Sequence, residues 1–308
     1  MKKRYIEMRL KIILVFLFTP LSVDAQPIIE GSGSFIIPGG EGRIDKTVSI
    51  YFHVPQNWKE DSPVVLVIPG AGRNAWSYRN AWVTESEKKG FIVVSPSYSD
   101  EFYPRFWNYN IARMIGDVEI NKAKTNFENF SISSNSNEWI FNDFDRIFDD
   151  IKSKLTLTTE TYDVFGHSAG GQILHRFALF YDSKKVDKIL SSNSGWYTVP
   201  NFETKFPTGL IDAPINRENL KHAFSKKLIL FLGELDNENE TRGHLLKNPR
   251  MNKQGLHRLE RGHYFYVKAK EQAAALSADF RWEKVVISGV GHDYKKMSIA
   301  ASHYLYGQ

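Results

Sequence analysis

The 308-residue chain contains no cysteine. Disulfide bonds, thiol catalysis and cysteine-ligated zinc are therefore excluded. Other metal-binding patterns are missing as well, because the sequence has no H-E-x-x-H pair and no calcium-binding loop. We expect neither a metal ion nor a cofactor. A chain of this length with 42% hydrophobic residues is long enough to be stabilised by its apolar core alone.

Long apolar runs are also absent, and the run at residues 12–18 is too short to span a bilayer. A basic segment precedes this run, and a small-x-small cleavage pattern ends at Ala25. These features predict a signal peptide over residues 1–25 that is cut after Ala25, with an uncleaved anchor as the alternative. We therefore expect a secreted or periplasmic protein that has no stable membrane insertion after cleavage.

The rest of the chain has little net charge. Residues 1–25 carry five basic and two acidic side chains, so their removal lowers the formal net charge from +5 to +2. No basic patch with interleaved aromatic residues is present, and we expect no nucleic-acid partner. A basic cluster alternates with loop-forming residues and is interpreted as a solvated surface. Its members are Lys247, Arg250, Lys253, Arg258 and Arg261.

Residues 166–170 (GHSAG) fit the pattern G-x-S-x-G, which places a serine on a sharp turn between a strand and a helix. The glycines on either side keep side chains from colliding where the chain reverses. The context agrees, because residues 161–165 are typical of a buried strand and apolar residues recur at helical spacing over 173–181. The pattern predicts Ser168 as a nucleophile, with His167 shaping the site beside it.

The acid of such a site is expected after a later strand. Residues 227–232 (KLILFL) are typical of a central strand and continue into a loop that contains Asp236. We assign the acid to Asp236. Glu234 and Glu238 occupy the same loop and remain alternatives for this role.

The base is expected after the last strand. Residues 284–287 (KVVI) predict that strand, and the glycine-containing loop after it carries His292. Asp293 is interpreted instead as the N-cap of a following helix. Ser168, Asp236 and His292 are therefore the predicted catalytic triad. In such a triad the imidazole takes the serine proton and the carboxylate holds the imidazole in the required tautomer.

An oxyanion hole needs two backbone N–H donors, one of them from the residue after the nucleophile, here Ala169. The second donor comes from the loop after an early strand. Residues 63–68 predict such a strand, and a glycine-rich loop follows it. We predict Ala71 as the second donor, with Gly72 as the alternative. Gly70 and Gly72 are expected to lie beside the substrate.

Strand-like and helix-like segments alternate along the chain. This alternation predicts a mostly parallel central sheet of about eight strands with helices on both faces, in one catalytic domain over residues 26–308. An alternating apolar pattern at 47–54 predicts an outer antiparallel strand. Helical spacing predicts helices near 78–89, 139–155 and 255–278.

Two aromatic segments follow strands at the sheet edge where open α/β sheets bind ligands. Residues 98–109 include Trp107, and residues 193–200 include Trp196. Such rings either wall a substrate groove or pack a loop onto the core. Trp107 and Trp196 are our candidates for substrate contact. The polar, irregular region 111–137 is a candidate cap.

Together these motifs resemble the α/β-hydrolase superfamily. The layout is similar to secreted serine esterases of the polyhydroxybutyrate-depolymerase and feruloyl-esterase branch, over about residues 46–306. Pro69 departs from the family pattern, because many members carry histidine there. The segments that carry the resemblance are residues 70–74, 166–170, 233–236 and 291–292.

The resemblance implies a secreted serine hydrolase that cleaves small-molecule or polymeric carboxylic esters through an acyl-enzyme. Acyl groups on polysaccharides and short polyesters are the expected substrates. A peptidase or amidase with the same triad is one alternative. A non-catalytic binding protein on a hydrolase scaffold is another, although the chain retains all three triad residues.

Overall fold

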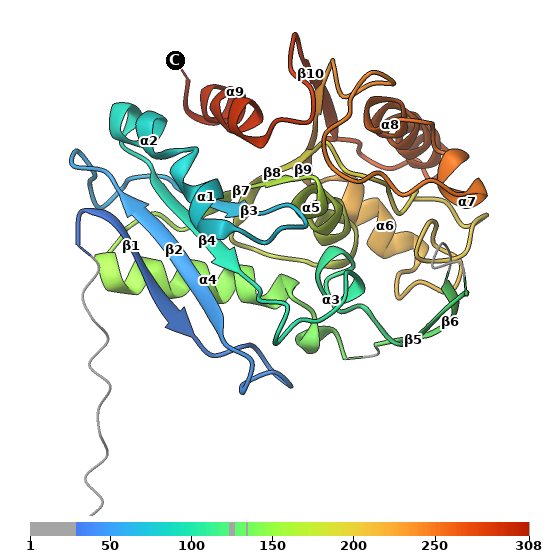
Figure 1. Cartoon of the computed structure of the whole chain (residues 1–308), viewed down its shortest axis with the longest axis horizontal. Helices are drawn as coiled ribbons and strands as arrows, with labels where there is room; N and C mark the ends of the chain where they lie inside the picture. The colour runs from blue at the N-terminus through green and yellow to red at the C-terminus, as the bar shows by residue number, and fades with distance from the viewer. Residues whose placement is uncertain (1–28, 123–126, 134, 308) are drawn as a thin grey trace, which may run out of the picture.

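The computed structural model describes residues 29–122, 127–133 and 135–307, and the signal peptide predicted for residues 1–25 lies outside them. One eight-stranded sheet forms the centre, in the order β1-β2-β4-β3-β7-β8-β9-β10 (Figure 1). The β1–β2 and β2–β4 pairs are antiparallel and the other neighbours are parallel, which confirms the mostly parallel sheet. The strands are β1 (Gly31–Ile37), β2 (Val48–Val54), β3 (Val64–Ile68), β4 (Ile92–Ser97), β7 (Tyr162–His167), β8 (Val186–Ser192), β9 (Lys227–Gly233) and β10 (Glu283–Ile287).

Helices cover both faces of this sheet, and the side chains of each strand alternate between two apolar layers. On β3, Val64, Leu66 and Ile68 belong to the layer that contains residues of α4, α5 and α8. Val65 and Val67 belong to the layer on the other face, with residues of α1 and α9. The helices are α1 (Ala75–Asn80), α2 (Val83–Lys89), α3 (Trp107–Asn110), α4 (Phe141–Leu155), α5 (Ala169–Phe180), α6 (Arg217–Phe224), α7 (Pro249–Asn252), α8 (Arg258–Ala275) and α9 (Tyr294–Tyr306).

Three elements differ in detail from the sequence-based expectations. The helix expected near 78–89 is divided into α1 and α2, because the indole of Trp82 is buried at the junction against Phe91 and Phe165. The helix expected over 255–278 is α8, which is shorter at both ends. The strand expected at 47–54 is antiparallel, but it pairs on both sides, so β1 and not β2 is the outer strand.

Residues 111–137 were expected to be irregular, but their described part forms a two-stranded antiparallel sheet of β5 (Ile115–Ile120) and β6 (Phe127–Ile132). Apolar side chains on one face pack against the core, whereas polar side chains on the other face are exposed. Those polar residues hid the strand pattern in the sequence. No helix among the described residues combines the length and apolar character needed to cross a membrane.

Candidate active site

Ser168 occupies a strained turn between β7 and α5. Its backbone has φ 59° and ψ −112°, which non-glycine residues rarely adopt. Glycine is required beside it, because a Cβ on Gly170 would lie 2.1 Å from the carbonyl oxygen of Ile68. The N–H of Ser168 donates to the carbonyl of Ser192 on the neighbouring strand, at 2.9 Å. The turn therefore fixes the serine at the carboxyl end of the sheet.

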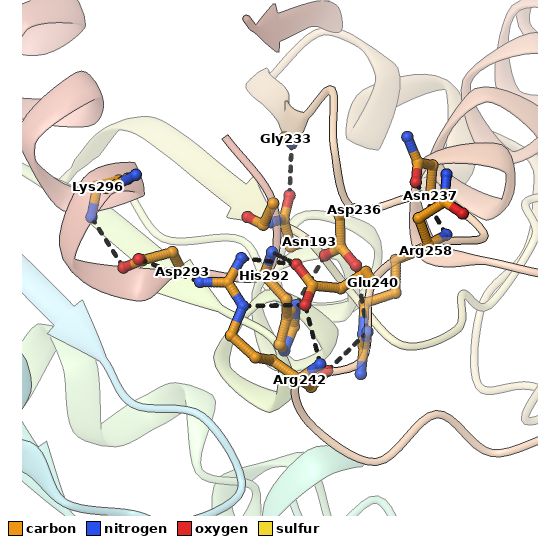
Figure 2. A network of polar contacts seen from close by, with 12 residues as sticks. Asn193, Gly233, Asp236, Asn237, Glu240, Arg242, Arg258, His292, Asp293 and Lys296 are labelled. Carbon is orange, nitrogen blue, oxygen red and sulfur yellow. Dashed lines mark hydrogen bonds and ion pairs between the residues drawn. The ribbon is translucent and has the colours of Figure 1, made fainter. Parts of the chain in front are cut away.

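The structure brings the three predicted triad residues together. His292 Nε2 lies 3.2 Å from Ser168 Oγ, and His292 Nδ1 lies 2.7 Å from Asp236 Oδ2 (Figure 2 shows the acid and the histidine). Of the two alternative acids, Glu234 accepts hydrogen bonds from the loop after β10, and Glu238 lies near the start of α8. Asp236 is thus the acid in contact with the histidine.

Asp236 is buried between His292 and Arg258. Its Oδ1 accepts a hydrogen bond from Arg258 Nη1 at 3.2 Å, and both side chains are almost inaccessible to solvent. The interpretation of the basic cluster as a solvated surface is therefore wrong for Arg258 and Arg261, which are 3% and 0% exposed. Both are on α8, and the spacing of charges in the sequence did not reveal that this part of the helix faces the interior.

Glu240 and Arg242 complete this side of the site (Figure 2). The backbone N–H of His292 donates to Glu240 Oε2 at 2.6 Å. Arg242 binds both oxygens of Glu240, at 2.9 and 2.7 Å, and also contacts Asp293 at 3.2 Å. Hydrogen bonds from Arg242 and from the N–H of His292 hold the pKa of Glu240 at about 2, so this carboxylate is ionised at neutral pH. Sequence reasoning missed both residues, because they looked like members of a polar loop.

Asn193, at the end of β8, joins the two loops that carry the acid and the histidine. Its Oδ1 accepts the N–H of Gly233 at 2.8 Å, and its Nδ2 donates to the carbonyl of Gly291 at 3.2 Å (Figure 2). One side chain therefore fixes the loop after β9 relative to the loop after β10. No motif in the sequence marked Asn193 for this role.

His167 lies against the triad histidine, with ring centroids 4.5 Å apart. Burial lowers the pKa of His167 well below its usual value, and the nearby His292 lowers it further. Its Nδ1 lies 3.4 Å from the hydroxyl of Tyr78. His167 is thus a neutral ring that packs beside His292.

Several solved protein structures have the same fold as this chain. Poly(aspartic acid) hydrolase-1 from Sphingomonas sp. KT-1 is 32% identical, with 91% of this chain and all of that chain covered and a TM-score of 0.78. A poly(3-hydroxybutyrate) depolymerase from Bordetella parapertussis is 26% identical, with 90% of each chain covered and a TM-score of 0.78. No protein-family model and no curated protein sequence matches the chain.

The chain belongs to the α/β-hydrolase superfamily. More distant members share its fold, among them an S-formylglutathione hydrolase from Agrobacterium tumefaciens at 13% identity, with 92% of this chain and 96% of that chain covered and a TM-score of 0.53. Within the superfamily the two solved structures described first are named as a hydrolase and a depolymerase, and the contacts of His292 with Ser168 and with Asp236 are the arrangement of a serine hydrolase. The strand order and the serine turn described above are the framework on which this chemistry is built.

In this α/β-hydrolase, a cavity of about 530 Å³ opens beside Ser168. Both residues predicted to form the oxyanion hole, Ala71 and Ala169, line it, and so do Gly70 and Gly72. The N–H of Gly70 is bonded to the hydroxyl of Tyr78. The larger part of the wall is apolar or aromatic. It includes Tyr78, Phe106, Trp196, Leu246 and Tyr294.

The two predicted substrate-contacting tryptophans differ in position. Trp196 lines the cavity and is 3% exposed. Trp107 is not among the described residues that line it, because its ring packs edge-on against Phe106 and Phe127. Phe106, one position earlier, occupies the cavity wall. Successive residues of a helical turn point in different directions, and the sequence alone did not show which aromatic residue faced inward.

Proposed function

We propose that this protein hydrolyses carboxylic esters through an acyl-enzyme on Ser168. The observation that carries the proposal is the continuous chain of hydrogen bonds from Ser168 through His292 to Asp236 at the wall of an open cavity. The burial of Asp236 beside Arg258 keeps its carboxylate in place as a partner for the imidazole.

The proposed reaction follows from these positions. Ser168 Oγ attacks the ester carbonyl while His292 Nε2 takes its proton, and the N–H groups of Ala71 and Ala169 stabilise the oxyanion. The tetrahedral intermediate collapses, and His292 returns the proton to the departing alcohol. Water then attacks the acyl-enzyme with His292 as the base, which releases the acid and restores the serine. Asp236 stabilises the imidazolium in both halves of the reaction.

Acyl groups on polysaccharides, or short polyesters, are the proposed substrates. The open cavity with aromatic walls supports this proposal, because apolar and aromatic side chains can bind an acyl chain. The similarity to a poly(3-hydroxybutyrate) depolymerase supports a polyester. Amide hydrolysis is the second candidate. The neighbour at 32% identity is named for poly(aspartic acid), a polymer of amide-linked residues.

We also propose that residues 1–25 are a signal peptide and that the mature protein acts outside the cytoplasm. The basic segment, the short apolar run and the small-x-small pattern before Gln26 support this. N-terminal sequencing of the protein recovered from the periplasm or medium tests it. A mature N-terminus at Gln26 is expected, whereas an intact Met1 in the cytoplasmic fraction contradicts the proposal.

The catalytic proposal is tested with purified protein and its Ser168→Ala variant. Hydrolysis of chromogenic acetyl, butyryl and octanoyl esters is measured beside a matched anilide, together with labelling by a fluorophosphonate. We expect labelling and ester hydrolysis in the wild type and the loss of both in the variant. Faster cleavage of the anilide than of the ester favours the amidase, and absence of labelling in the folded wild type favours a non-catalytic binding protein.

A further inference from the structure

Arg242 lines the catalytic cavity and Arg176, Arg258 and Arg261 lie behind its wall. These four arginines differ in whether they form an ion pair with a carboxylate. Arg258 binds Asp236, and Arg242 binds Glu240 and Asp293. We call this side the triad wall, formed by Asp236, Glu240, Arg242, Arg258 and His292. The other two, Arg176 and Arg261, are fully buried, and neither forms an ion pair within the described chain.

Arg176 lies directly behind the cavity. Its guanidinium stacks on the ring of Trp196, at 4.2 Å from the centroid, and donates to the carbonyls of Asn110 and Gln172 at 3.0 and 2.8 Å. All three of these residues line the cavity. Its Nε donates to the hydroxyl of Thr198, whereas Nη2 has no partner in the described chain. Burial lowers the pKa of Arg176 to about 9, which still leaves it protonated at neutral pH.

Arg261 supports the same wall from α8. Its Nη1 donates to the carbonyl of Gly195 at 2.5 Å, and its Nε donates to the carbonyl of Gly255 at 2.9 Å. Gly195 and the adjacent Trp196 both line the cavity. Burial lowers the pKa of Arg261 to about 10, so this side chain is also cationic at neutral pH. The neighbouring Glu260 interacts with Arg261 electrostatically but forms no ion pair with it. Two positive charges that lack an ion pair with any described carboxylate therefore lie behind one short segment of cavity wall.

Gln172 provides a polar group on the cavity side of these charges. It is four residues after Ser168 and therefore on the same face of α5, one turn further along. Its side chain is 6% exposed and lines the cavity, and its Oε1 has no hydrogen-bond partner in the described chain. The amide can rotate to present either nitrogen or oxygen to a ligand. Asn110 contributes a second side-chain amide to the lining.

No aspartate or glutamate is found among the described residues that line the cavity. A buried charge that lacks a partner is unfavourable, and a ligand that supplies the opposite charge in a water-poor site relieves this. We propose that the wall formed by Asn110, Gln172, Gly195 and Trp196 is a subsite for a substrate carboxylate a few bonds from the scissile carbonyl. We call it the Trp196 wall; the inference rests on the proposed function, because it assumes that substrate binds in this cavity.

In this arrangement the amide nitrogens of Gln172 and Asn110 donate to the carboxylate. Arg176 and Arg261 do not touch the ligand. They attract the carboxylate electrostatically from behind the cavity wall. Arg176 also holds Trp196 and the carbonyls of Asn110 and Gln172 in position. Arg242 does not take this role, because Glu240 and Asp293 already neutralise it. The preferred substrates are accordingly half-esters of dicarboxylic acids, or polymers that carry carboxylates beside the cleaved bond.

Binding to the Ser168→Ala protein tests this subsite without any need for turnover. The ligands are monomethyl glutarate and its neutral counterpart of similar shape, methyl 5-methylhexanoate, with affinities measured by NMR titration at low ionic strength. We expect the carboxylate to bind at least about tenfold more tightly. Equal binding, or tighter binding of the neutral ester, overturns the proposal.

Substitutions then show which residues cause the tighter binding of the carboxylate ligand. In the Ser168→Ala background, Gln172→Glu should abolish it, because the new carboxylate repels the ligand and supplies the missing partner to the buried arginines. Arg176→Met should reduce the preference and Arg176→Lys should retain part of it, whereas a purely structural role of Arg176 would weaken both ligands equally. If Arg176→Met does not fold, Gln172→Glu beside Gln172→Met decides, since only the charged variant should abolish the preference completely. A preference unchanged in Gln172→Glu overturns the subsite.

The same two esters separate this inference from the proposed function when the wild type is assayed by pH-stat titration. Hydrolysis of both esters at similar kcat/KM refutes the subsite and leaves the esterase in place. Selective binding in Ser168→Ala together with an inactive, unlabelled wild type refutes the esterase and leaves the subsite in place. A kcat/KM ratio of about ten or more in favour of the half-ester supports both.

Discussion

On the triad wall each arginine faces a carboxylate, whereas behind the Trp196 wall Arg176 and Arg261 face backbone carbonyls, a hydroxyl, a side-chain amide and an aromatic ring. On the triad wall, paired charges and hydrogen bonds hold Asp236 and His292 at fixed positions. Behind the Trp196 wall lie two buried positive charges that form no ion pair with any described carboxylate. Buried charge thus serves positioning on one side of the cavity and, in our proposal, recognition on the other.

The largest expected effect comes from breaking the triad wall at its acid. Asp236→Asn should lower kcat by about 10⁴-fold, because the amide favours the wrong imidazole tautomer and cannot stabilise the imidazolium. Steady-state kinetics on a chromogenic butyrate ester measure this. Glu234→Gln is the matched control, since Glu234 lies in the same loop but binds Ser288 and Gly289. The control should stay active, and full activity in Asp236→Asn would show that Asp236 is not the triad acid.

Removing one arginine from each wall compares the two directly. Arg258→Met leaves the buried carboxylate of Asp236 without its cation and should lower the free energy of unfolding by about 3–5 kcal/mol. Arg176→Met leaves no carboxylate unpaired and should cost less than about 2 kcal/mol. Urea unfolding at pH 7 gives both values. Equal losses in the two variants would contradict the difference in pairing between the walls.

The serine turn joins the two walls, and its glycines are tested separately. Gly170→Ala should destabilise the protein by about 1–3 kcal/mol or more and also impair catalysis, because its Cβ would collide with the backbone of Ile68. Gly72→Ala is the control for stability, since its Cβ would meet only the side chain of Asn74, at 3.2 Å. Thermal unfolding of both variants measures the contrast, and a Gly170→Ala protein as stable as Gly72→Ala would exclude the close approach.

The smallest effect concerns the pH dependence of the triad wall. The pKa of Glu240 is depressed from 4.5 to about 2 in the folded protein, so its contribution to stability is complete above pH 4.5 and is lost as the pH falls towards 2. The contribution should be about 1–2 kcal/mol, because the partner Arg242 is half exposed and its charge is screened. Glu240→Gln should therefore show a smaller loss of stability between pH 5 and pH 3 than the wild type does. Identical pH profiles of the two proteins would contradict the assignment.

Local patterns in the sequence predicted much of the framework. The elbow at 166–170, the strands before Asp236 and His292 and the helices on both faces follow from apolar periodicity and glycine placement, which act over a few residues. The sequence did not predict secondary structure correctly where the local apolar pattern was interrupted. Polar residues on the exposed face hid β5 and β6, and the buried Trp82 divided an expected helix into α1 and α2.

The sequence by itself determined the order of the elements and the residue types available to the site, because chain order and local spacing are written in it. Only the tertiary structure decided which acid reaches His292 and that Phe106 and not Trp107 faces the cavity. It also decided that, among the described residues, Arg258 has a carboxylate partner while Arg176 has none. These outcomes depend on distances between segments tens to more than a hundred residues apart, and on the direction in which each side chain points. Neither quantity is set by local spacing, because both arise when the strands and helices pack into one core.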